Sequence, residues 1–123
     1  MDAHLEVRGH YKLEVWRQGI RLVKEVYVVT KGFPREEQFG LCSQMRRVAV
    51  SVPSNIAEGV ARTGNRELLK YLAIASGSLS ELDTQLIIAR ELGYVPEGHE
   101  IFRNASHEAR LLAGFIRSIE ARR

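Results

Sequence analysis

The chain has 123 residues, a length typical of a single domain with one hydrophobic core. Hydrophobic residues make up 45% of the sequence and charged residues 27%, which excludes a disordered, collagen-like or membrane-embedded chain. The net charge of +3 is compatible with nucleic acid as a partner but does not require one.

Three further signals favour a cytoplasmic protein. The longest apolar runs are too short to cross a bilayer. The sequence begins without a basic segment followed by an apolar one, so we predict no secretory signal. The single cysteine, Cys42, excludes a disulfide within the chain and is typical of a reducing compartment. We therefore expect a cytoplasmic location and no membrane partner.

The first predicted helix spans 8–31, because apolar residues recur there at steps of three and four. Gly32 and Pro34 mark its end and the approach to the next helix. Its predicted core face consists of Leu13, Trp16, Ile20, Val23 and Tyr27.

The second predicted helix spans 35–61 and contains Pro53. A proline inside a helix removes a backbone donor and crowds the carbonyl four residues earlier, so we expect a kink or break near Pro53. The valine-rich stretch 48–52 is compatible with a strand by composition, but the helical period continues on both sides of it. The predicted core face is Leu41, Cys42, Met45, Val48, Ala49, Val52, Ile56 and Val60.

The third and fourth predicted helices span 65–92 and 97–121. Connections of about three to six residues place sequential helices side by side and antiparallel. We therefore predict one all-α domain over 1–123, an antiparallel up-down-up-down four-helix bundle.

Three of these helices carry apolar residues outside their predicted core face. Single exposed apolar residues are ordinary, but recurring second seams are typical of interfaces. We therefore predict a homo-oligomer. The predicted interface residues are Val15, Leu22, Val26, Val29, Leu69, Ile74, Ile87 and Ile88.

Two polar stretches interrupt the second and third helices. Gly77 in the middle of a helix costs up to about 1 kcal/mol relative to alanine, which indicates that another helix approaches it closely. We expect Asn55, Glu58 and Glu81 to be at least partly buried and to hydrogen-bond between the two helices, whereas full exposure would favour a binding role. The predicted structural polar residues are Ser51, Asn55, Glu58, Gly59, Arg62, Gly77, Ser78, Glu81 and Gln85.

These stretches carry a family resemblance. Asn55-Ile56-Ala57-Glu58-Gly59 with Arg62, Gly77-Ser78-Leu79 with Glu81, Gln85-Leu86, and the ending Leu92-Gly93-Tyr94 resemble the four-helix-bundle proteins encoded in intervening sequences of bacterial 23S ribosomal RNA genes. The resemblance extends from about Tyr11 to Tyr94. It implies a homopentamer without known enzymatic activity and with a proposed nucleic-acid-binding role. The family is similar to the accessory proteins of diversity-generating retroelements, basic pentamers that bind a reverse transcriptase and nucleic acid.

The sequence gives no pattern for catalysis or metal binding. The four histidines are scattered, without His-Glu-x-x-His or Glu-x-x-His spacing. Glu58 and Glu81 could face each other from adjacent helices, but the further inward carboxylates and histidines of a two-metal site are missing. Cys42 lies on a core face and behaves as a small hydrophobe. We predict a non-enzymatic protein with no metal and no cofactor.

Basic residues form stripes along the first and fourth helices. Arg103, Arg110 and Arg117 recur every seven residues, and Arg122 and Arg123 extend their stripe. A charged stripe can also be a solvated face. No aromatic residues interleave, so we predict electrostatic binding of RNA or DNA without base reading. The alternative is an oligomeric scaffold for a polymerase-type protein such as a reverse transcriptase. The predicted nucleic-acid-binding residues are Arg17, Arg21, Lys24, Arg46, Arg47, Arg103, Arg110 and Arg117.

Overall fold

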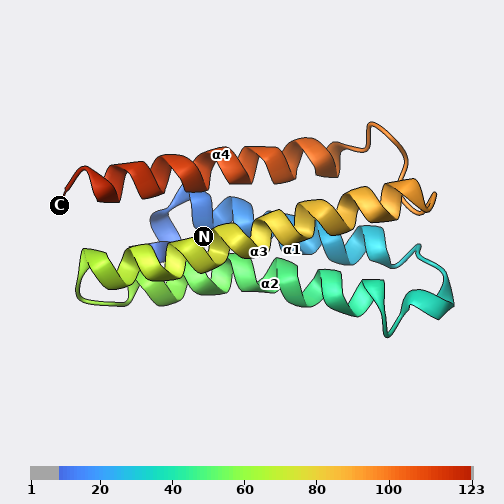
Figure 1. The fold of residues 1–123 in the computed structure, drawn as a ribbon, viewed down its shortest axis with the longest axis horizontal. Helices are drawn as coiled ribbons and strands as arrows, with labels where there is room; N and C mark the ends of the chain where they lie inside the picture. Colours follow the sequence, from blue (N-terminus) through green and yellow to red (C-terminus); the bar gives the residue numbers. More distant parts are fainter. Residues whose placement is uncertain (1–8, 123) are drawn as a thin grey trace.

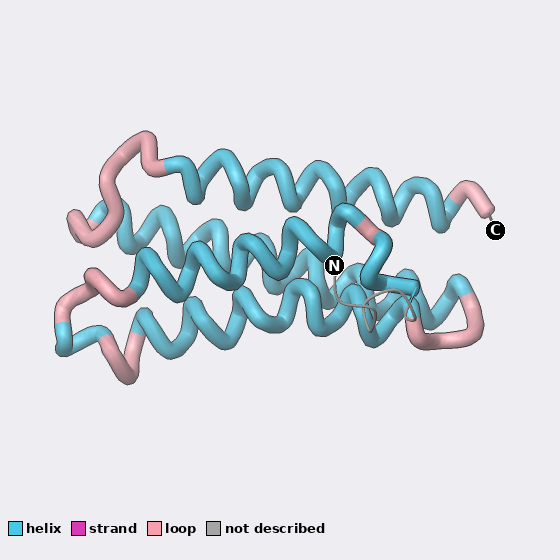
Figure 2. The backbone as a smooth tube through the Cα atoms, turned by 180° about the vertical axis from the view of Figure 1, so that it is seen from behind, coloured by secondary structure: helices cyan, strands magenta, loops and turns pink. Residues whose placement is uncertain are grey.

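The computed structural model describes residues 9–122, and within that range it contains helices and no strand. The four long helices lie side by side in a bundle (Figure 1). Their connections alternate between the two ends, so that sequential helices are antiparallel (Figure 2). The all-α four-helix bundle is confirmed. In chain order the elements are η2 (Gly9–Lys12), α1 (Glu14–Thr30), η3 (Arg35–Glu37), α2 (Leu41–Val60), α3 (Asn65–Glu91) and α4 (Glu100–Glu120).

The helices form a closed square. Each packs closely against the next along the chain, and α4 also packs closely against α1, whereas within residues 9–122 no backbone of a diagonal pair comes within 8 Å, Cα to Cα. The α2–α3 pair is the most extensively packed, and a Cβ added to Gly59 would lie 2.9 Å from Cβ of Tyr71. The square therefore has four faces, named below by the two helices that border each one.

Most of the core face predicted for the second helix is buried, and α3 and α4 each bury one apolar stripe against it. α2 buries Cys42, Met45, Ala49, Val52 and Ile56; α3 buries Leu72, Ala75, Leu79, Leu82, Leu86 and Ala89; α4 buries Ile101, Ala105, Leu112 and Ile119. None of the helices within the described range is long and apolar enough to span a bilayer.

The boundaries differ from the predictions mainly at helix starts. The second predicted helix is divided into η3 and α2 by a turn that ends at Gly40. α4 begins later than predicted because Gly98 adopts φ +84° and the His99 imidazole caps the helix, its Nδ1 accepting the Ile101 N–H at 3.0 Å. Residue 8, the predicted first residue of the bundle, lies outside the described residues.

Pro53 does not break its helix. α2 continues as one helix through this position, so of the predicted kink or break the break is excluded and the kink stays a prediction. The proline ring is buried against Gly19 of α1, where an added Cβ would lie 3.3 Å from the ring Cβ. A proline ring inside a helix crowds the turn before it and needs room beside the helix. Gly19 has no side chain, so α1 leaves that room for the Pro53 ring.

The predicted core face of the first helix is only partly right, because Leu13, Trp16 and Val23 are partly buried against the core but do not form its centre. Leu22 is 1% exposed, whereas Ile20 and Tyr27 are 44% and 40% exposed. Val15 and Val26 are buried with Leu22, so these three residues face the chain's own core and cannot form an interface between copies. Both seams of α1 have spacings of three and four, and only the fit of Gly19 against Pro53 selects the buried one.

Candidate nucleic-acid interface

The α1/α4 face brings the two predicted basic stripes together. The side-chain amide of Asn104 donates to a carboxylate oxygen of Glu25 at 2.8 Å, and Gly19 lies against the Glu108 carboxyl. These contacts fix the antiparallel register of α1 and α4. They place Arg17 about level with Arg110.

Five basic residues of these two helices are grouped as the basic face: Arg17, Arg21, Lys24, Arg103 and Arg110. Of these, Arg21 and Lys24 line a recess between α1 and α4. Lys24, Arg103 and Arg110 are exposed and form no ion pair with other residues of 9–122. Arg21 is partly neutralised, because it pairs with Glu14 and donates from Nε to Gln18 at 3.0 Å. The basic face therefore offers several cations to an anionic partner.

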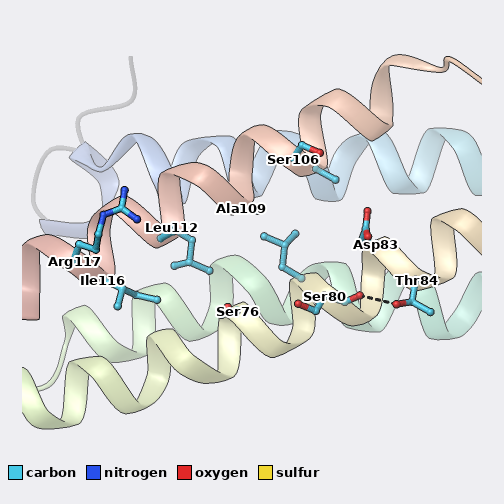
Figure 3. A pocket seen from close by; sticks show the side chains of 12 residues that line it. Ser76, Ser80, Asp83, Thr84, Ser106, Ala109, Leu112, Ile116 and Arg117 are labelled. Atoms are coloured by element: carbon cyan, nitrogen blue, oxygen red, sulfur yellow. Dashed lines mark hydrogen bonds between the residues drawn. The ribbon is translucent and has the colours of Figure 1, made fainter.

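The other three predicted basic residues lie elsewhere. Arg117 is on the α3 side of α4, in the wall of a groove between these helices (Figure 3). Arg46 donates from Nε to the Thr30 hydroxyl at 2.9 Å and stacks over the Tyr27 ring at 4.7 Å. It therefore ties α2 to α1. Arg47 is exposed on α2, in a shallow recess between α2 and α3.

The structure contains a polar link between α2 and α3, as predicted, but not all of the residues expected to form it take part. The hydroxyls of Ser51 and Ser78 are 2.8 Å apart, and the half-buried Asn55 amide donates to the Ser51 carbonyl at 2.8 Å. The predicted burial of Glu58 and Glu81 is wrong, because both side chains are exposed. On their helices, both residues lie toward the solvent-facing edges of the α2–α3 seam rather than at its buried centre.

A second link closes the end of the same seam. Arg62 pairs with Glu58 at 2.7 Å and donates to the Tyr71 hydroxyl at 3.0 Å, so α2 and α3 are joined at the surface. Gly77 was predicted to permit a close helix approach, but an added Cβ there would meet nothing within 4 Å. Within the chain, Gly59 and Gly19 have that role.

The described part of the chain gives little support for a metal site or a reactive cysteine. No group of three or more His, Cys, Asp or Glu side chains there could hold a metal ion. Cys42 is buried as predicted, and burial raises the pKa of its thiol.

The chain was compared with known protein families, curated proteins and solved structures. Residues 11–115 match the sequence profile described as 23S rRNA-intervening sequence protein. The chain belongs to this family. The crystal structure of a protein of unknown function from the S23 ribosomal protein family of Bacteroides thetaiotaomicron VPI-5482 is similar, with a TM-score of 0.77 and 19% identity over 84% of this chain and 95% of that one. At this identity it supports the fold alone. The comparison with curated proteins found no match.

The bundle also buries a carboxyl group that the sequence did not reveal. Glu108 of α4 is 0% exposed, and neither carboxyl oxygen has a hydrogen-bond partner among residues 9–122. Burial raises the pKa of Glu108 to about 8, opposed by nearby Arg21 and reinforced by Glu14. The available signal was its spacing, three residues after Ala105 and four before Leu112, on the core face of α4. At neutral pH this carboxyl is mostly protonated.

Proposed function

We propose that this member of the family is a non-catalytic homo-oligomer, with five chains as the expected number, that binds RNA or DNA through its basic face. The observation that supports this most is the matched placement of two cationic rows on adjacent helices, with Lys24, Arg103 and Arg110 unpaired within residues 9–122. Such a surface holds a phosphate backbone by charge.

Assembly strengthens this interaction. Each chain carries a formal charge of +3, and the protonated Glu108 leaves one negative charge fewer. Several copies joined together present several basic faces to one polyanion, so the effective concentration of cations rises without any new contact. The five residues of the basic face are lysine and arginine, without an aromatic side chain among them on which a base could stack. We therefore expect little preference for base sequence.

Charge reversal tests this function. Lys24→Glu, Arg103→Glu and Arg110→Glu together should weaken binding of a structured RNA by more than about tenfold, because each removes a phosphate contact. The matched control is Lys12→Glu, Arg47→Glu and Arg66→Glu, which changes the net charge equally at exposed positions outside the basic face. Fluorescence anisotropy gives both affinities, and circular dichroism checks helicity. Equal losses in the two variants would show that net charge, and not the basic face, controls binding.

A protein scaffold is the second candidate, with a polymerase-type protein as partner. The observation that favours it is Phe39, whose side chain is 91% exposed beside the recess that contains Arg47 and Glu81. Aromatic side chains are enriched in protein interfaces. A wild-type protein without measurable affinity for RNA or DNA at low salt would favour this candidate.

A further inference from the structure

The α1/α2 face carries an apolar surface that the core does not use. Ile20 and Tyr27 of α1 and Val50 of α2 are each at least 40% exposed. Tyr27 lies under Arg46, and Val50 follows Arg46 by one helical turn, so the three residues border the same face. With the half-buried Trp16 and Val23 they form what we call the apolar face.

The opposite face, between α3 and α4, is hollow. A groove of about 590 Å³ runs along it, with Leu79, Leu112 and Ile116 among its lining residues (Figure 3). Its α3 wall includes Ser76, Ser80 and Thr84, and its α4 wall Ala109 and Ala113, so both walls consist largely of small side chains one turn apart. We call it the small-residue groove.

The α3 wall continues onto Ala73 and Gly77, which are also exposed. Gly77 lies inside a 27-residue helix and has no neighbour in the chain within reach of a Cβ. A glycine in this position destabilises a helix by up to about 1 kcal/mol. Nothing within the described chain offsets that cost, which is understandable if another chain approaches there.

Contacts inside the bundle fix how the two faces align along its axis. The bond between Ser51 and Ser78 sets the register of α2 and α3. Pro53, two residues beyond Ser51 on the antiparallel α2, is then about level with Ser76. Gly19 packs against Pro53. Gly19 of α1 and Ser76 of α3 therefore lie at about the same height, and α1 and α3 run in the same direction.

This register matches large residues with small ones. Ile20 is level with Gly77, and Tyr27, seven residues on, is level with Thr84. The same offset pairs Trp16 with Ala73 and Val23 with Ser80. A second copy displaced sideways without tilting thus brings large side chains opposite small ones along about three turns of helix.

The charges of the two faces are also complementary at one end. Lys31, Arg35 and Arg46 line one recess beside the apolar face. Arg46, five residues before Ser51, is about level with Asp83, which lines the small-residue groove and forms no ion pair within the described residues. Arg117 lies at the other end of the groove, away from this cationic recess (Figure 3).

We propose that the apolar face of one copy docks in the small-residue groove of the next, with both copies pointing in the same direction. This inference rests on the proposed homo-oligomer and adds which surfaces form it. Because the two surfaces are different, each copy binds one neighbour on either side, and the assembly closes into a ring where successive copies are also rotated about an axis parallel to the bundle. The basic face belongs to neither surface and stays accessible in the assembly.

Two substitutions test the two surfaces separately. Ile20→Glu places a charge in the apolar face, and its matched control is Val28→Glu, an exposed aliphatic residue of α1 on the α1/α4 side. Gly77→Gln fills the approach to α3, and its matched control is Gly114→Gln, a glycine inside α4 where an added Cβ meets only the Arg117 side chain at 3.8 Å. Gly77→Gln raises helix propensity, so loss of assembly in this variant cannot be attributed to unfolding.

Sedimentation equilibrium at micromolar concentration gives the outcome. We expect Ile20→Glu and Gly77→Gln to sediment as single chains of 13.9 kDa and both controls to retain the wild-type mass. An equimolar mixture of the two variants retains one intact pair of surfaces, so it should form a species of twice the 13.9 kDa chain mass and nothing larger.

Three results would overturn the inference. If both variants keep the wild-type mass, the interface lies elsewhere, although the proposed homo-oligomer stands. If both dissociate but their mixture forms no two-chain species, the contact is not between these unlike surfaces. A wild-type protein that sediments as a single chain would refute both the docking and the homo-oligomer, and RNA affinity measured on the charge-reversal variants would still decide the binding role separately.

Discussion

The α2–α3 seam and the α3–α4 seam share one helix, yet they are built differently. The first is closed by the contact of Gly59 with Tyr71, the Ser51–Ser78 hydrogen bond and the Arg62 link. The second leaves a groove lined by serines and alanines. Ser51, Ser78 and Arg62 in the first seam have partners, whereas among the described residues the buried Gln85 Oε1 of α3 and both carboxyl oxygens of Glu108 on α4 have none. The bundle therefore places its tight internal packing on one side of α3 and its open surface on the other.

Gly59→Val should have the largest effect, because it forces the closed seam apart. An added Cβ would lie 2.9 Å from Tyr71 Cβ and 3.2 Å from the Leu68 carbonyl oxygen, and backbone cannot yield as a flexible side chain does. We expect a loss of about 3 kcal/mol in the free energy of unfolding, measured by urea denaturation. Ala109→Val in the open groove is the comparison, and a similar loss there would remove the contrast between the seams.

Glu108→Met should stabilise the protein by about 1–3 kcal/mol, since it removes two unpartnered buried oxygens and keeps a similar side-chain volume. Urea denaturation of both proteins at pH 7 measures the difference. A destabilised variant would indicate that the carboxyl has a partner in solution, such as an ordered water molecule.

The pH dependence of stability tests the same group in another way. The pKa of Glu108 is about 8 in the folded chain against an ordinary value of 4.5, so the folded state binds more protons between these values. Its contribution to stability is fully present below pH 4.5 and is lost as the pH rises through 8. Melting temperatures should therefore fall from pH 5 to pH 8 in the wild type by more than in Glu108→Gln. Parallel curves for the two proteins would contradict the burial of a protonated carboxyl.

Removal of the Ser51–Ser78 bond should have a smaller effect. Ser51→Ala and Ser78→Ala should each cost about 0.5–1.5 kcal/mol, and the double variant should cost less than their sum because the two hydroxyls bond to each other. A double-mutant cycle by thermal denaturation measures this coupling. Strict additivity would mean that the hydroxyls do not interact in solution.

Glu58→Ala should have the smallest effect, below about 1 kcal/mol, because its ion pair with Arg62 is exposed to solvent. High salt should reduce even this difference in melting temperature. A large loss would restore the expectation, taken from the sequence alone, that Glu58 is a buried structural group.

The spacing of the apolar residues and the positions of glycine and proline were sufficient to predict the fold. Gly93 ends α3 with φ +83°, and the uninterrupted stripe of apolar residues through α2 outweighed its valine content. The orientation of α1 could not be predicted, because both of its apolar seams have helical spacing and the contact of Gly19 with Pro53, far apart in sequence, selects one. Glu108 was missed for a related reason. A glutamate at a core position looks like a surface residue until the packing of α1 and α4 around it is known.

The basic residues were only partly predictable. Heptad spacing identified the stripe that contains Arg103 and Arg110, but spacing within one helix cannot show which helix lies beside it. The Asn104–Glu25 bond supplies that information, since it shows that α1 lies beside α4 and sets their register. Arg46 looked equivalent to Arg47 in the sequence, and only the structure shows it tied to Thr30 and Tyr27.

The salt dependence of RNA affinity tests the central claim most directly. If the basic face binds phosphates, a plot of the logarithm of the association constant against the logarithm of salt concentration should be steep for the wild type, because each phosphate contact releases counterions. The slope should become shallower in the Lys24→Glu, Arg103→Glu, Arg110→Glu variant and stay unchanged in the Lys12→Glu, Arg47→Glu, Arg66→Glu control. An affinity that does not change with salt, or a slope that the first variant leaves intact, would contradict the account.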